Sequence, residues 1–60
     1  MSYARAKEIA LLRLALRASW AAGDRATAHA LLAKLTAAAN ENGHDQELVA
    51  ETRRWAIKLA

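Results

Sequence analysis

The sequence lacks cysteine, proline and phenylalanine, and it contains only two glycines and one valine. Without cysteine the chain forms no disulfide, and two histidines alone cannot complete a four-ligand structural zinc site. The scarcity of β-branched residues argues against a sheet, whereas 17 alanines and 9 leucines favour helix. We therefore predict an all-α fold.

Sixty residues form one domain at most, which we place over residues 1–60. A chain of this length buries only about 60% of the surface that its unfolded form exposes. Its stability must therefore come from well-formed helices or from a partner chain. The net charge of +3 and the isoelectric point near 10.0 are compatible with an acidic partner but do not require one.

Charged residues interrupt the apolar run that follows Tyr3, beginning with Arg5 and Lys7 and continuing with Arg13 and Arg17. They argue against a secretory leader and against a membrane span, which needs ~20 mostly apolar residues. We expect a cytoplasmic protein or a recombinant soluble one, with no membrane partner. The absence of cysteine fits a reducing compartment.

Two turn signals divide the chain, one at Gly23 and the other around Gly43. Glycine suits the left-handed position that follows a helix, and each of these glycines precedes a residue able to begin the next helix. The sequence therefore predicts three helices, at about residues 2–22, 24–41 and 44–59.

Residues that favour the first position of a helix stand at each predicted start. Ser2 and Asp24 are good N-cap residues for the first two helices. The third helix begins at His44 or Asp45, and if His44 is the cap, Glu47 falls at the reciprocal position of a capping box.

Apolar residues recur at helical spacing, about 100° per residue, in all three segments. Trp20 and Trp55 belong to these core stripes, and we predict that both anchor the core because buried aromatic rings contribute large contact areas. The stripes comprise Ile9, Leu12, Leu16 and Trp20; Ala28, Leu31, Leu32, Leu35, Ala38 and Ala39; and Leu48, Val49, Thr52, Trp55, Ala56 and Leu59.

The first helix carries a second apolar face nearly opposite its core stripe. One stripe is enough for an intramolecular core, and a further contiguous apolar patch usually marks an interaction site. We predict that this face mediates self-association, with a homodimer favoured over larger assemblies. The face, which we call the outer face, comprises Leu11, Leu14, Ala15, Ala18 and Ala22.

Small residues line the side of the second helix that lies opposite its leucines. They could provide a secondary contact, because small side chains let helices approach closely. Their alternative role is that of neutral helix formers on a solvated face. This alanine stripe comprises Ala26, Ala30, Ala33 and Ala37.

Residues 9–36 resemble a tetratricopeptide repeat hairpin. The matching positions are Gly23 and Asp24 at the turn, Ala28 at the small packing position, and Leu32 and Leu35. The sequence departs from the family at Leu16 and Ser19, where glycine and tyrosine are preferred, and at Asn40, where proline often closes the repeat. The resemblance implies an antiparallel hairpin followed by a helix similar to the family's capping helix, and it implies no peptide groove. The alanine and leucine content also resembles that of de novo designed helical bundles, and a designed origin stays open.

The residues offer little catalytic chemistry. The chain has no cysteine nucleophile, no glycine-rich phosphate loop and no recognisable serine, histidine and acid arrangement. His29 and His44 stand fifteen residues apart, without the one-turn spacing that directs two ligands at one metal ion. We expect no enzyme, no metal site, no cofactor and no small-molecule substrate.

These considerations favour a structural or interaction module that forms a helical homo-oligomer. The alternative is a small basic helical module that binds nucleic acid or another acidic partner. Its nine lysines and arginines are spread over all three predicted helices and form no single basic ridge, which argues against nucleic acid.

Overall fold

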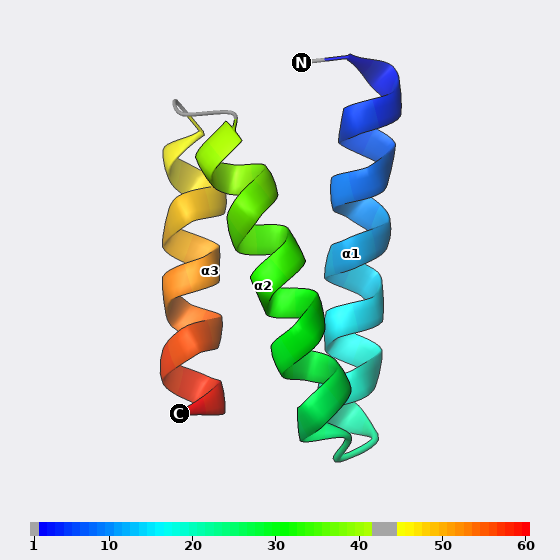
Figure 1. Cartoon of the computed structure of the whole chain (residues 1–60), viewed down its shortest axis with the longest axis vertical. Coiled ribbons are helices and arrows are strands. Elements are labelled where there is room, and N and C mark those ends of the chain that lie inside the picture. Colours follow the sequence, from blue (N-terminus) through cyan, green and yellow to red (C-terminus); the bar gives the residue numbers. More distant parts are fainter. Residues whose placement is uncertain (1, 42–44) are drawn as a thin grey trace.

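The protein folds into three α-helices, as its computed structural model shows for residues 2–41 and 45–60 (Figure 1). Helix α1 spans Tyr3–Ala21, α2 spans Arg25–Glu41 and α3 spans Gln46–Leu59. Successive helices reverse direction, so α1 and α3 run the same way and α2 runs against both. The described residues contain no strand, and the all-α prediction is confirmed.

Side-chain caps define the helix starts. Ser2, Asp24 and Asp45 each accept a hydrogen bond from the backbone N–H three residues further on, at 3.1 to 3.2 Å. These bonds satisfy amides that have no partner within the first turn of a helix. Ser2 and Asp24 cap as predicted. Asp45 is the cap of α3, and His44 lies outside the described residues, as does Gly43.

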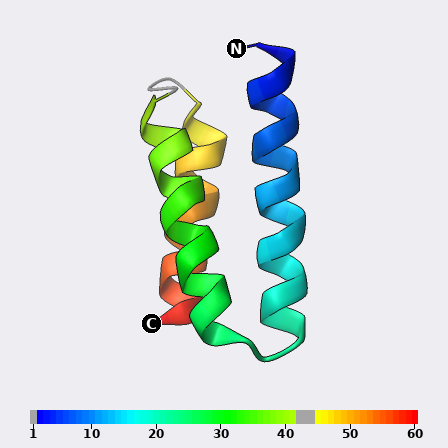
Figure 2. The same ribbon diagram turned by 45° about the vertical axis from the view of Figure 1, so that its right-hand side comes forward.

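The turn between α1 and α2 depends on Gly23, whose φ of +76° lies in the left-handed region. The N–H of Gly23 donates to the carbonyl of Trp20 at 3.1 Å, and the N–H of Asp24 donates to that of Ser19 at 2.9 Å. These bonds satisfy carbonyls at the end of α1 while the chain reverses. The predicted left-handed glycine is confirmed here, and the tight turn holds α1 and α2 side by side (Figure 2).

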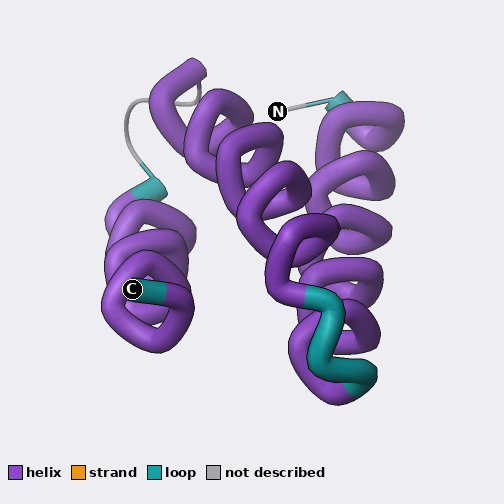
Figure 3. The backbone as a smooth tube through the Cα atoms, turned by 60° about the horizontal axis from the view of Figure 1, so that its bottom comes forward, coloured by secondary structure: helices purple, strands orange, loops and turns teal. Residues whose placement is uncertain are grey.

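Helix α2 is the centre of the fold, because α1 and α3 both pack against it and not closely against each other (Figure 3). No Cα atom of α1 lies within 8 Å of one in α3. The three helices together extend over 32 × 20 × 14 Å. The two outer helices therefore lie apart on α2, with a groove between α1 and α3.

The core consists of apolar side chains from all three helices. Most of the predicted core residues are buried, and Leu12, Leu31 and Val49 pack against them half-buried. Two predictions are wrong: Ala56 is exposed, and Trp20 keeps 37% of its surface accessible. Both lie at the margins of their stripes, about 40° or more from the stripe centre, where neighbouring helices cover a side chain least. The buried apolar residues are Ile9, Leu16, Ala28, Leu32, Leu35, Ala38, Ala39, Leu48, Trp55 and Leu59.

Polar contacts fix both ends of α2 to its neighbours. At its start, Arg25 donates to the carbonyl of Leu59 at 2.9 Å and so satisfies a carbonyl at the end of α3. At its end, Glu41 forms an ion pair with Arg5 of α1. Thr52, the buried polar residue of the described chain, donates its hydroxyl to the carbonyl of Val49 at 2.8 Å.

Candidate functional site

The outer face of α1 is exposed along most of its length. Leu11 keeps 56% of its surface accessible and Leu14 keeps 61%, while Ala18 and Ala22 are exposed and Ala15 is half-buried. Leu14 is two residues from the buried Leu16, which places it about 200° around the helix from the core. The structure thus places the predicted self-association face where it is free to meet another molecule.

The alanine stripe of α2 is also exposed, at Ala26, Ala30, Ala33 and Ala37. These residues lie on the side of α2 away from its buried leucines, as the spacing predicts. Because α2 is the neighbour of α1, the alanine stripe and the outer face belong to the same antiparallel hairpin.

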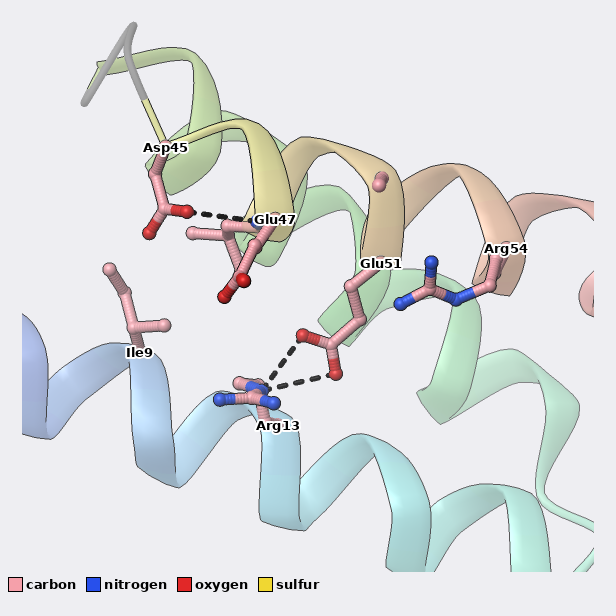
Figure 4. Close-up of a pocket in the computed structure, with 8 residues that line it drawn as sticks. Ile9, Arg13, Asp45, Glu47, Glu51 and Arg54 are labelled. Atoms are coloured by element: carbon pink, nitrogen blue, oxygen red, sulfur yellow. Dashed lines mark hydrogen bonds and ion pairs between the residues drawn. The ribbon is translucent and has the colours of Figure 1, made fainter.

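A second candidate site lies in the groove between α1 and α3. Its wider part is a hollow of about 410 Å³, with Ile9 and Arg13 on the α1 side and Glu47, Glu51 and Arg54 among its residues from α3 (Figure 4). The Nε of Arg13 lies 2.9 Å from one carboxylate oxygen of Glu51 and donates to the other at 3.1 Å. This ion pair connects two helices whose backbones do not touch.

An aromatic pair crosses the same groove further along α1 and α3. The rings of Trp20 and Trp55 meet edge to face, with centroids 6.1 Å apart and planes inclined by 74°. The ammonium of Lys58 lies 5.1 Å from the ring centroid of Trp55 and 5.8 Å from that of Trp20. Both distances are within the range of a cation–π interaction, so the two indoles hold this cation at the groove.

Three basic side chains gather at this end of the groove. Arg17 from α1 and Arg54 and Lys58 from α3 line a hollow of about 270 Å³ together with Glu51 and Trp55. We call Arg17, Arg54 and Lys58 the basic cluster. The prediction of no single basic ridge did not include this cluster.

A signal for the basic cluster does exist in the sequence. Arg13 and Arg17 are four residues apart, as are Arg54 and Lys58, so each pair lies on one face of its helix. What the spacing does not reveal is that these two faces border the same groove. That follows from the placement of α1 and α3 on one side of α2.

Among the described titratable groups, Asp24 has a clearly perturbed acidity. A hydrogen bond from the hydroxyl of Thr27, followed by one from its backbone N–H, lowers the pKa of the Asp24 carboxyl below its ordinary value of 3.8. Both bonds stabilise the carboxylate, and their geometry is that of a helix cap. The lowered pKa of Asp24 therefore follows from its role as the cap of α2.

Of the two histidines that a metal site would have to use, the structure describes only His29. His29 is exposed on α2, and His44 lies outside the described residues. Within residues 2–41 and 45–60, no three histidine, aspartate or glutamate side chains gather as a metal site would require.

Comparison with known protein families, curated proteins and solved structures finds no match. The resemblance of residues 9–36 to a tetratricopeptide repeat hairpin therefore stays a prediction. Among the described helices, none combines the length and hydropathy that a membrane crossing requires.

Proposed function

We propose that the protein is a helical interaction module that self-associates, as a homodimer, through the outer face of α1. The observation that carries the proposal is the exposure of Leu11 and Leu14, one turn apart, on a face whose five residues are all apolar. Between Ile9 and Ala22 the charged residues are Arg13 and Arg17, which border the groove and also line a small hollow beside Leu14. Contiguous apolar surface of this kind usually marks an interaction site.

The size of a stable interface suggests how much of the hairpin takes part. A standard interface covers about 800 Å² on each partner, roughly a fifth of the 4169 Å² surface of this chain. Helix α1 is 19 residues, or about 28 Å, long, and one face about 10 Å wide provides too little area alone. We propose that the alanine stripe of α2 supplies the remaining area, since it is also exposed and its small side chains allow close approach.

A second copy of the chain is the simplest partner for this surface, because self-association requires no other molecule. Full burial of a leucine stabilises by about 1.5–3 kcal/mol, and a symmetric dimer buries each exposed leucine twice. These gains offset part of the translational and rotational entropy that association costs.

Sedimentation equilibrium at micromolar concentration tests the proposal. We expect a mass of about twice 6.5 kDa for the natural chain, and a mass near 6.5 kDa for Leu14→Glu. Ile57→Glu is the matched control, because Ile57 of α3 is also an exposed aliphatic residue, at 78%, outside the outer face. This control should stay dimeric. A concentration-independent monomer mass for the natural chain contradicts the proposal.

A basic module that binds nucleic acid or another acidic partner is the second candidate. The basic cluster of Arg17, Arg54 and Lys58 favours it. The two candidates separate by salt dependence, since screening weakens contacts between exposed charges but leaves apolar association intact. A dimer that persists in 1 M salt supports the first candidate, and binding of an acidic partner that is lost on adding salt supports the second.

A further inference from the structure

The basic cluster has more positive charge than its surroundings neutralise. Arg17, Arg54 and Lys58 share their hollow with a single carboxylate, that of Glu51, and Glu51 is already paired with Arg13. Three cations therefore share this hollow with one carboxylate, and Arg13 already neutralises that carboxylate from the adjoining hollow. An incoming anion would meet a local excess of positive charge there.

Packing fixes part of this charge in place before any ligand arrives. The ammonium of Lys58 is held near the rings of Trp20 and Trp55, at 5.8 and 5.1 Å from their centroids. Trp55 is buried at 9% exposure, so the ring beneath the ammonium is itself fixed by the core. A cation positioned in this way loses less entropy on binding an anion than a freely rotating lysine does.

The hollow at the opposite end of the groove has more acidic than basic side chains, since Asp45, Glu47 and Glu51 share it with Arg13 and Arg54. Asp45 and Glu47, at the start of α3, line the wider hollow of about 410 Å³ (Figure 4). Arg54 stands seven residues after Glu47, about 10 Å along the helix. An extended polypeptide covers that distance in about three residues. The groove therefore presents negative and then positive charge over the length of a short peptide.

We propose that this groove binds a polypeptide segment with carboxylates at one end and basic side chains about three residues away. Its carboxylates lie against Arg17, Arg54 and Lys58, and its basic side chains lie against Glu47. The inference rests on the second candidate function and specifies its partner as a polypeptide. A nucleic acid is a poorer match, because its phosphates are negative along its whole length and would also meet Asp45 and Glu47.

The test compares two capped peptides of identical composition. The first has the sequence Glu-Glu-Ala-Ala-Lys-Lys, and the second is the shuffled Lys-Glu-Glu-Lys-Ala-Ala, in which no lysine lies three residues from a glutamate. Binding is followed by tryptophan emission, since both tryptophans border the groove, and independently by titration calorimetry. We expect the first peptide to bind about fivefold more tightly, the ratio that one exposed ion pair provides at most.

Neighbouring arginines of α3 provide the matched variants. Arg54→Ala should weaken binding of the first peptide about fivefold, whereas Arg53→Ala should leave it unchanged, because Arg53 lies about 100° further around the helix. Helix content by circular dichroism verifies that both variants stay folded. If Arg54→Ala is misfolded, Lys58→Ala replaces it as the variant that removes one charge from the basic cluster.

Several results overturn the inference. One is that the two peptides bind with equal affinity, or that neither peptide binds. Another is that Arg53→Ala and Arg54→Ala lower the affinity for the first peptide equally. A single-stranded oligonucleotide that binds more tightly than the first peptide also overturns it, but leaves the second candidate function standing as a nucleic-acid module.

Discussion

Trp20 of α1 and Trp55 of α3 meet edge to face, 6.1 Å between centroids, across two helices whose backbones do not touch. The pair closes one end of the groove, while the ion pair of Arg13 and Glu51 spans its middle. The relative position of α1 and α3 therefore depends on side chains that reach across the groove and on their shared contact with α2.

Trp55→Ala should destabilise the protein more than Trp20→Ala does. Trp55 is 9% exposed, and truncating a buried tryptophan costs about 3 kcal/mol or more. Trp20 is 37% exposed, so its truncation should cost about 1 kcal/mol, chiefly from the lost aromatic contact. A 60-residue chain has roughly 3–9 kcal/mol of stability in total. Urea denaturation followed by circular dichroism measures both losses, and similar losses would contradict the geometry of the pair.

Arg13→Ala should lower the free energy of unfolding by about 1 kcal/mol, towards the upper end for partly exposed ion pairs. The side chain of Glu51 is only 13% exposed, so removal of Arg13 leaves a largely covered carboxylate without that partner. Glu51→Gln in the Arg13→Ala background should recover part of the loss, since the amide carries no charge. A double-mutant cycle on urea denaturation gives the coupling, and a coupling of zero would show that the pair contributes nothing to stability.

Gly23→Ala should cost about 1 kcal/mol, because residue 23 has a φ of +76° and an L side chain rarely adopts that conformation. A Cβ atom added at Gly23 would meet no heavy atom within 4 Å, so the loss is one of backbone conformation and not of packing. Gly23→Asn is the control and should cost less, since asparagine tolerates the left-handed region. Thermal unfolding of the three chains compares them, and equal midpoints would argue against a left-handed turn.

Acid should remove the contribution of the Asp24 cap. Because hydrogen bonds from Thr27 lower the pKa of the folded Asp24 carboxyl below 3.8, the stability that they provide is present above pH 3.8. It is lost as the pH falls through the lower pKa of the folded state. The stability difference between the natural chain and Asp24→Asn should therefore shrink below pH 3.8.

The carboxyl titration of Asp24, followed by NMR, measures the same effect directly. Thr27→Val removes the hydroxyl that makes the largest contribution, and its midpoint should move up towards 3.8. An unchanged midpoint in this variant would show that the hydroxyl of Thr27 does not stabilise the carboxylate.

The sequence by itself determined the helices. Alanine and leucine content, the cap residues Ser2 and Asp24, and Gly23 act through local contacts within a few residues, and such effects can be read along the chain. The core stripes follow from helical periodicity for the same reason, and so does the exposure of Leu11 and Leu14 opposite them.

Only the tertiary structure decided which helices are neighbours. The periodicity of α1 and α3 is the same whether they touch or stand apart on α2, and the second arrangement leaves Trp20 partly exposed and Ala56 uncovered. It also brings Arg17 beside Arg54 and Lys58. A basic cluster shared between two parallel helices arises from their separation and rotation, which depend on how side chains pack on α2 and not on local spacing.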